Sequence, residues 1–360
     1  MQRKQHNVVR WSLIVGTAVA LLLLVAACGG DDGSEPVAEV ENVEAAVPDT
    51  AVVVSPVPET AVSPTPLPTN QPPPTPTAVP TETAPPTPTP LPTPIPTLPP
   101  RPAPLYVNGI PPELIIVMPE EVVQNSRQIF AKGQGLGRNS LRFSTAGDSI
   151  AQTPQYLTWF DDPEQYNLGE FAYLQPVIDA FAGSFAHQGE AMRDGLNTTA
   201  VLDPTWANKD ECEPNETPLA CEIRVYNPSV MLVLFGTNDW SDTFQENMRE
   251  VVEYTIEQGV IPVIVTKANR VEGSNNYRNI IMRELAAEYQ VPLWDFDRIA
   301  ETIPNRGVDE DQAHMTIINL ADYTHPATIM RGYGLHNITA LMALDSLLRD
   351  VIWADVNGNR

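Results

Sequence analysis

The C-terminal two-thirds of the chain alternates between short apolar runs and amphipathic segments. Residues 230–235 and 260–265 are almost continuously apolar, which is typical of strands buried on both faces. The shorter runs 141–145 and 291–294 predict two further strands. Helices are expected at residues 119–131, 173–181, 244–258, 276–289 and about 335–353.

Strands separated by helices predict a parallel sheet with helices on its faces. The expected fold class is therefore α/β, a three-layer α/β/α sandwich with a mostly parallel central sheet. In such sheets ligands bind at the carboxyl ends of the strands. Polar residues that directly follow an apolar run are therefore the first candidates for a functional site.

The N-terminal residues have the pattern of an export signal. Arg3, Lys4 and Arg10 precede an apolar run, residues 11–27, that ends directly before Cys28. This ending resembles a bacterial lipobox, which implies removal of residues 1–27 as a lipoprotein signal peptide and lipidation of Cys28. The alternative is an uncleaved signal anchor, for which the run is at the short limit. Both readings place the rest of the chain outside the cytoplasm, in the cell envelope.

Residues 28–104 are rich in Pro and Thr and cannot form a packed core. Proline fixes φ and removes backbone donors, so we expect a lipid-anchored, disordered linker with extended polyproline II character. It would act either as a stalk or as a passive spacer. Residues 105–360 remain as one domain large enough for a substantial core.

The net charge bears on nucleic acid as a partner, and the cysteines bear on a disulfide or a metal site. The formal net charge is -24 and no basic run lies outside the signal, so nucleic acid is not an expected partner. Cys212 and Cys221 lie close together in a polar loop, and outside the cytoplasm they are expected to form a disulfide. A metal site is the alternative, but that loop contains no histidine and no third cysteine.

The first candidate for chemistry is Ser149. It follows residues 141–145 in the sequence Gly147-Asp148-Ser149, where a strand running into a tight turn would lift the hydroxyl out of the core. The same tripeptide also occurs in ordinary turns, because Asp and Ser side chains bond the local backbone.

A second polar cluster, Gly236-Thr237-Asn238-Asp239, follows the apolar run at residues 230–235. At the same sheet edge, the Asn238 amide could donate to a developing oxyanion. The alternative is that Asn238 only starts a turn or caps the next helix.

A carboxylate and an imidazole three residues apart form the third element. His314 could take the serine proton while Asp311 orients the ring. Asp322 and His325 have the same spacing and are the rival pair.

Taken together and in this order, these blocks resemble the SGNH (GDSL-like) hydrolases, over essentially residues 119–349. Residues 143–150 match the first block, residues 236–239 the third, and Asp311 to His314 the closing Asp-x-x-His. Details such as residues 201–204, 259–263 and 332–334 resemble a bacterial exported subgroup, and these favour His314 over His325.

The resemblance implies an SGNH/flavodoxin-like fold and an ester hydrolase with a covalent acyl intermediate on Ser149. His314 would be general base and acid, Asp311 would orient it, and no cofactor or metal is required. The oxyanion hole would consist of Ser149 N–H, Gly195 N–H and the Asn238 amide. Gly189 is the alternative to Gly195, whose neighbours Arg193 and Asp194 replace the small polar residues usual in the family.

The resemblance leaves the substrate open. An ester of a polysaccharide, a lipid or a small molecule would fit, and the membrane would be a partner only through lipidated Cys28. The alternative function is a surface-anchored carbohydrate- or ligand-binding protein that keeps the fold with weak catalysis.

Overall fold

The computed structural model describes residues 98–102 and 106–354. All of them belong to one compact unit, Thr87–Arg360. The predicted signal peptide, Cys28 and most of the predicted linker lie outside the described residues. Within the part that is described, no helix is both long and apolar enough to span a bilayer.

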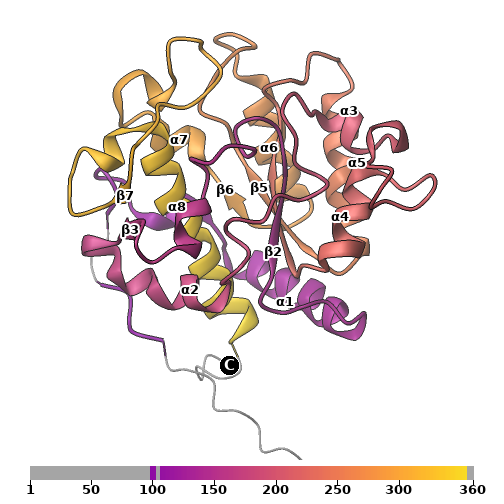
Figure 1. Cartoon of the computed structure of the whole chain (residues 1–360), viewed down its shortest axis with the longest axis horizontal. Coiled ribbons are helices and arrows are strands. Elements are labelled where there is room, and N and C mark those ends of the chain that lie inside the picture. The colour runs from indigo at the N-terminus through magenta and orange to yellow at the C-terminus, as the bar shows by residue number, and fades with distance from the viewer. Residues whose placement is uncertain (1–97, 103–105, 355–360) are drawn as a thin grey trace, which may run out of the picture. The chain divides into compact units, whose positions relative to one another are not determined.

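A five-stranded sheet forms the centre of the domain, with strand order β1-β6-β5-β4-β2 (Figure 1). The strands β2, β4, β5 and β6 are parallel, and only the edge strand β1 is antiparallel, to β6. A separate two-stranded parallel sheet pairs β3 with β7. The strands are β1 (Ile116–Val117), β2 (Phe143–Gly147), β3 (Tyr166–Asn167), β4 (Val230–Leu234), β5 (Ile261–Val265), β6 (Leu293–Trp294) and β7 (Ala321–Asp322).

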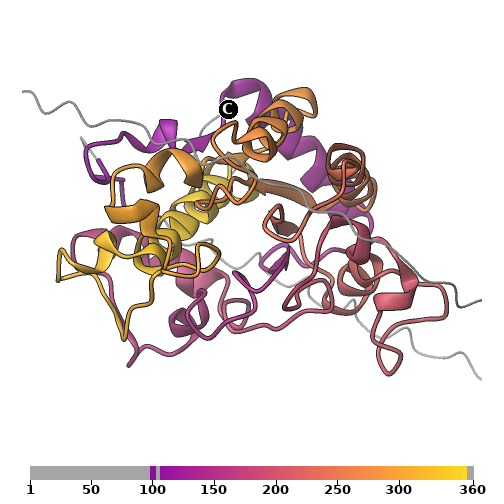
Figure 2. The same cartoon turned by 90° about the horizontal axis from the view of Figure 1, so that it is seen from above.

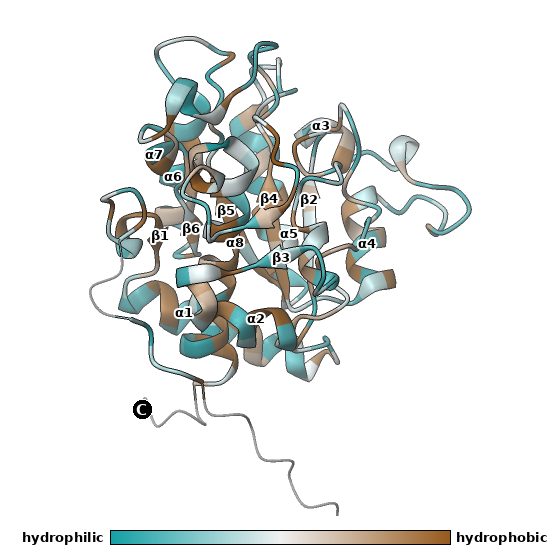
Figure 3. Ribbon diagram, turned by 60° about the vertical axis from the view of Figure 1, so that its left-hand side comes forward, coloured by the Kyte–Doolittle hydropathy of each residue, from teal (hydrophilic) through white to brown (hydrophobic). Residues whose placement is uncertain are grey.

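The apolar runs became strands because the sheet is covered on both faces. Every residue of β2, β4 and β5 is buried, as expected for parallel strands inside a layered α/β fold. Figure 3 shows apolar strands at the centre and polar colour on the outward faces of the helices. The predicted three-layer fold with a mostly parallel sheet is confirmed.

The helices pack on both sides of the sheet. On one side α4 contacts β2, while α5 and α6 contact β5; on the other, α8 contacts β1 and β6 and is itself covered by α2. The α-helices are α1 (Glu120–Gly135), α2 (Gln175–Ala180), α3 (Thr198–Val201), α4 (Pro218–Tyr226), α5 (Phe244–Glu257), α6 (Tyr277–Glu288), α7 (Phe296–Ala300) and α8 (Gly332–Leu347). Short 3₁₀ segments are η1 (Pro112–Leu114), η2 (Thr158–Asp161), η3 (Gly169–Leu174), η4 (Pro204–Trp206), η5 (Pro304–Gly307) and η6 (Thr328–Met330), and α8 continues into one π-helical turn, η7 (Leu348–Ile352).

The predicted helices are all present with shifted ends. The expected helices at 244–258 and 276–289 correspond closely to α5 and α6, whereas α1 runs four residues beyond the predicted end at 131. The segment 173–181 is helical, but its start belongs to η3. α8 begins at Gly332, before the expected start near 335.

The end of the predicted linker contacts the domain. Leu98 is buried, and Arg101 Nε donates to the buried Asp345 carboxylate of α8 at 2.7 Å. Arg349 Nη1 donates to the Pro99 carbonyl oxygen at 2.7 Å. Residues 98–102 therefore pack with the domain, although the linker was expected to extend to residue 104.

Cys212 and Cys221 are joined by a disulfide. Cys221 lies on the buried face of α4, and the bridge ties to it the loop that precedes this helix. Glu216 lies close to both sulfur atoms, but two sulfurs bonded to each other cannot act as thiolate ligands. The predicted disulfide is present in place of the alternative metal site.

Candidate active site

Ser149 lies half-buried in the turn that follows β2, at the carboxyl edge of the sheet. Asp148 organises this turn: its carboxylate accepts from Ile150 N–H at 2.9 Å, and its carbonyl oxygen accepts from Ala151 and Gln152 N–H. From α8, the buried Tyr333 hydroxyl donates to the Ile150 carbonyl oxygen at 3.2 Å. The turn that carries the serine is thus held by Asp148 from within and by Tyr333 of α8.

The structure brings Ser149, His314 and Asp311 into one hydrogen-bonded chain. His314 Nε2 lies 2.9 Å from Ser149 Oγ, and His314 Nδ1 lies 2.6 Å from Asp311 Oδ2. An ionised carboxylate can only accept, so Nδ1 carries a proton and Nε2 of the neutral ring accepts from the serine hydroxyl. This tautomer is the one in which histidine can remove the serine proton.

Hydrogen bonds within the loop hold Asp311 and His314 in place. The Asp311 carboxylate also accepts from the backbone N–H groups of Ala313 and His314, at 3.0 and 2.9 Å. The hydrogen bond from the His314 side chain, together with these two backbone bonds, lowers the pKa of Asp311 to about 2. The carboxylate therefore stays ionised beside the imidazole at all ordinary pH values.

The rival pair lies in a different place. Asp322 ends β7, which pairs with β3, and His325 follows it with its side chain 75% exposed. His325 Nε2 is 3.5 Å from Asp322, while Ser149 is bonded by His314. The geometry favours His314, as the sequence indicated.

Asn238 lies in the turn after β4, as predicted, and its amide nitrogen is buried without a hydrogen-bond partner among the described residues. The neighbouring Asp239 fixes this turn: its carboxylate accepts from Gly236 N–H and from Thr198 N–H, both at 2.8 Å. Asp239 therefore connects the turn after β4 to the start of α3. A buried amide donor without a partner costs free energy unless a ligand uses it.

The two candidate glycines differ in their surroundings. Gly189 is buried, and a Cβ there would lie 2.4 Å from the Glu222 carboxylate, so glycine is required for packing. Gly195 is exposed, has a φ of +73°, and would have nothing within 4 Å of a Cβ. The open position of Gly195 suits an approaching ligand, and the geometry favours it over Gly189.

Gly195 lies in a segment that is tied to the turn of Ser149 and to the turn of Asn238. Gly147, the last residue of β2, accepts from Arg193 N–H at 3.1 Å and donates to the Ala191 carbonyl oxygen at 3.0 Å. Three residues after Gly195, Thr198 bonds Asp239. In the part of the chain that the structure describes, the backbone N–H groups of Ser149 and Gly195 have no hydrogen-bond acceptor. These two donors and the Asn238 amide all remain free.

The loop after a third strand, β5, also supports the site. Its role was not predicted from the sequence. Asn269, in the loop after β5, is buried, and its Nδ2 donates to Thr237 Oγ1 at 3.1 Å and to the Ala313 carbonyl oxygen at 2.9 Å. It thereby joins the turn that carries Asn238 to the loop that carries His314. Viewed from above, loops from separate parts of the domain meet at this edge (Figure 2).

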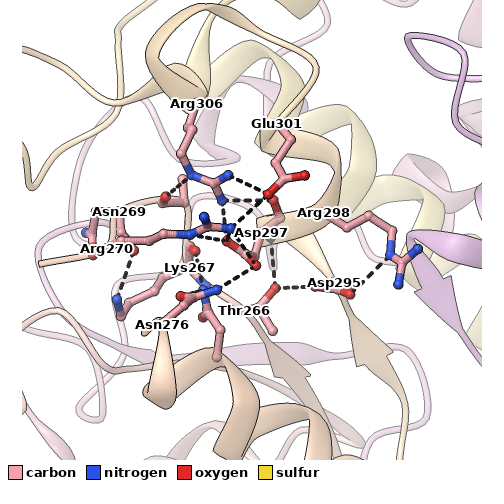
Figure 4. A network of polar contacts seen from close by, with 12 residues as sticks. Thr266, Lys267, Asn269, Arg270, Asn276, Asp295, Asp297, Arg298, Glu301 and Arg306 are labelled. Atoms are coloured by element: carbon pink, nitrogen blue, oxygen red, sulfur yellow. Dashed lines mark hydrogen bonds and ion pairs between the residues drawn. The ribbon is translucent and has the colours of Figure 1, made fainter. Parts of the chain in front are cut away.

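A cluster of charged residues holds the loop after β5 in place (Figure 4). Asp297 at its centre receives hydrogen bonds from Arg270, Arg283 and Arg306, and its backbone N–H donates to Thr266 Oγ1. Burial alone would raise the pKa of Asp297, but the Arg283 hydrogen bond and the charges of the other two arginines lower it. The Asp297 carboxylate is therefore ionised and paired with three arginines.

Lys267 bonds Asn269 itself, and Arg306 bonds the residue before it. The buried Lys267 ammonium group donates to the Asn269 carbonyl oxygen at 2.9 Å and pairs with Glu272. Arg306 Nε donates to the Ala268 carbonyl oxygen at 2.9 Å. The backbone at Asn269 is therefore held by hydrogen bonds to its own carbonyl oxygen and to that of Ala268. Its side chain bonds Ala313.

Asp148 is a buried ionisable group under the site. It is 1% exposed, and burial, with a further contribution from the Asp239 charge, raises its pKa to about 7 despite the opposing hydrogen bond from Ile150 N–H. The adjacent His314 acts in the opposite direction. The carboxyl group beside the candidate nucleophile therefore titrates near neutrality.

No described protein family and no curated protein matches the sequence. Solved structures similar to the chain include the psychrotrophic esterase EstA from Pseudoalteromonas sp., 14% identical with a TM-score of 0.36, over 60% of this chain and 99% of that one. Axe2, an acetylxylan esterase from Geobacillus stearothermophilus, is 13% identical with a TM-score of 0.34, over 57% of this chain and 95% of that one. A GDSL-like lipase from Bacteroides thetaiotaomicron is 12% identical with a TM-score of 0.34, over 62% and 98%. At these values the activity has to be inferred from the site itself.

Proposed function

We propose that the protein is a serine ester hydrolase of the SGNH type. The observation that carries this proposal is the hydrogen-bonded chain Ser149–His314–Asp311, with contacts of 2.9 and 2.6 Å. A nucleophile bonded to a base, which is bonded in turn to an orienting carboxylate, is the arrangement that acyl transfer to serine requires.

In the proposed reaction Ser149 Oγ attacks the ester carbonyl carbon while His314 Nε2 takes the hydroxyl proton. The tetrahedral intermediate collapses, the bond to the alcohol oxygen breaks, and His314 returns the proton to the departing alcohol. Water then attacks the acyl-Ser149 intermediate by the same route, which releases the acid and restores the serine. Asp311 holds the ring and stabilises its cationic form.

The negative charge of the tetrahedral intermediate would be stabilised by three donors: Ser149 N–H, Gly195 N–H and the Asn238 amide. Their support is that each lacks an acceptor within the described residues. Donors held in place before the reaction stabilise the oxyanion without reorganisation at the moment of attack.

The test is hydrolysis of 4-nitrophenyl acetate by the wild type and by Ser149→Ala, together with labelling by a fluorophosphonate. We expect turnover and labelling by the wild type, and loss of both in a folded Ser149→Ala protein. Retained turnover in the variant would remove Ser149 from the mechanism. A folded wild type that neither turns over nor labels would favour a binding protein with weak catalysis.

We also propose that the domain is exported and anchored to the membrane through lipidated Cys28. Its support is the signal-like N-terminus and the Cys212–Cys221 disulfide, a kind of bond that persists in oxidising compartments. Expression of full-length wild type and Cys28→Ser, followed by membrane fractionation and labelling with a fatty-acid analogue, tests this. The variant should lose the lipid label, and an unlabelled wild type would contradict the anchor.

A further inference from the structure

Two exposed tryptophans line a groove that Asn238 also lines. Trp206, at the end of η4, is 49% exposed, and Trp240, two residues after Asn238, is 71% exposed. Both line a groove of about 310 Å³ that also includes the Asn238 side chain. Large aromatic side chains exposed beside a candidate oxyanion donor indicate a binding surface.

An arginine contacts the Trp240 ring, and another bonds the Trp206 backbone. The buried Arg278 guanidinium lies 5.2 Å from the centre of the Trp240 ring and donates to the Gly236 carbonyl oxygen at 2.9 Å. Arg193 Nη1 donates to the Trp206 carbonyl oxygen at 2.9 Å, and the Asp203 side chain caps the turn before it. A ring held as Trp240 is binds a ligand with little loss of side-chain entropy.

Apart from the Asp239 carboxylate, the polar side chains of the groove are neutral. They belong to Asn197, Thr199 and Ser241. Thr199 Oγ1 already accepts from Asn247 Nδ2 at 2.8 Å, which leaves its own O–H free to donate. The one charged group, the Asp239 carboxylate, is occupied by Gly236 and Thr198. Such a lining suits uncharged hydroxyl groups better than an anionic headgroup.

From this lining we infer that the groove binds a sugar residue of an O-acylated glycan, which forms the alcohol side of the substrate. A pyranose ring has apolar C–H faces and a rim of hydroxyl groups, and it would use the tryptophan faces and the neutral donors together. A long acyl chain has no use for those donors. The inference rests on the proposed function, because it places the ester bond at Ser149.

The experiment compares substrates that do and do not contain sugar. Trp206→Ala, Trp240→Ala and the double variant are assayed with chemically O-acetylated xylo-, cello- and manno-oligosaccharides, with 4-nitrophenyl acetate and with 4-nitrophenyl octanoate. We expect each single variant to lower kcat/KM on at least one oligosaccharide about tenfold through KM, and to leave 4-nitrophenyl acetate within about twofold. Trp206→Phe and Trp240→Phe should recover most of the loss, because they keep an aromatic face.

The matched control is Tyr106→Ala. Tyr106 is an aromatic residue 56% exposed that lines a different cavity, with Arg101 and Pro111. The Tyr106→Ala variant should have the kcat and KM of the wild type on all substrates. A wild type that hydrolyses 4-nitrophenyl acetate but none of the oligosaccharides would overturn the inference. So would variants that lose octanoate turnover while keeping sugar turnover.

Failure of the proposed function would give a different result in these assays. If the wild type hydrolyses none of the esters, calorimetric titration of the same oligosaccharides into wild type and the double tryptophan variant still tests the groove. Binding that weakens in the double variant would support a sugar site without esterase activity. Equal or absent binding would overturn the sugar site as well.

Discussion

The side-chain amide of Asn269 donates a hydrogen bond to the Ala313 carbonyl oxygen at 2.9 Å, one residue before His314. The same nitrogen reaches Thr237 Oγ1, one residue before Asn238. A single buried side chain after β5 thus sets the spacing between the candidate base and the candidate oxyanion donor. It contacts no reacting atom, so its proposed role is positioning.

Replacing Asn269 by Ala should lower kcat on 4-nitrophenyl acetate about 10- to 100-fold, because a small displacement of the base is costly to catalysis. KM should change little. Steady-state kinetics measure kcat and KM separately. Labelling of Ser149 by a fluorophosphonate should slow in parallel with kcat. Asn125→Ala is the matched control, since Asn125 Nδ2 also bonds backbone carbonyl oxygens, those of Tyr289 and Gln290. An equal kcat loss in both variants would contradict a specific role for Asn269.

The strands β4 and β5 could be predicted because continuous burial leaves a continuous apolar signal. β2 lies two residues later than predicted, since Gly147 is held in the strand by partners distant in sequence, Leu234 on one side and the segment at Met192 on the other. The two-residue strand β1 could not be predicted, because only its antiparallel pairing with β6 defines it. α8 starts before the expected position, where the N–H groups of Gly332 and Tyr333 donate to Thr316, a contact distant in sequence.

The site residues Ser149, Asn238, Asp311 and His314 could be proposed from the sequence because each follows a recognisable strand or forms a short-range pair. Asn269 was missed although it too follows an apolar strand. The rule that polar residues at strand ends form sites also selects Asn269, because Asn269 lies in the loop directly after β5. The packing of Gly189 against the buried Glu222 carboxylate could not be predicted, because the two residues lie far apart in sequence.

The two histidine pairs make opposite predictions. His314→Ala should lower kcat/KM on 4-nitrophenyl acetate by about 10²- to 10⁴-fold, because it removes the general base. His325→Ala should stay within about twofold, since an exposed ion pair contributes little. Parallel assays of the two folded variants decide between them, and the reverse ranking would move the base to His325.

Loss of one oxyanion donor should be seen in turnover more than in binding. Asn238→Ala is expected to lower kcat about 10²- to 10³-fold with KM nearly unchanged. Asn247→Ala is the comparison, because Asn247 bonds Thr199 nearby and offers no donor to the proposed oxyanion. Single-turnover acylation rates give the cleanest measurement, and a fall of less than about threefold for Asn238→Ala would remove the amide from the proposed hole.

The disulfide should contribute to stability and not to catalysis. It closes a loop with a sequence separation of 9, for which the loss of unfolded-chain entropy corresponds to about 2.5 kcal/mol. The double variant Cys212→Ser, Cys221→Ser should therefore melt about 5–10 °C lower, while kcat at 25 °C stays unchanged. Thermal denaturation measures the first expectation. A reducing agent should lower the Tm of the wild type by the same amount and leave the double variant unaffected.

Asp148 should make the stability of the domain fall as pH rises toward neutrality. Burial raises its pKa from an ordinary 3.8 to about 7, so between these two values the folded state holds a proton that the unfolded chain has released. The stability that this group contributes is full below about pH 4 and is lost as pH rises through 7. Asp148→Asn keeps an oxygen that can accept from Ile150 N–H but cannot ionise, so the variant should escape this loss.

The measurement is the difference in Tm between Asp148→Asn and the wild type from pH 4 to pH 8. We expect a difference that grows in favour of the variant across this range and levels off above pH 7, since the remaining carboxylates titrate equally in both proteins. The comparison at pH 4 is the internal control for packing, because both side chains are then neutral. A constant difference at every pH would show that the Asp148 carboxyl group ionises with the same pKa in the folded and unfolded chains.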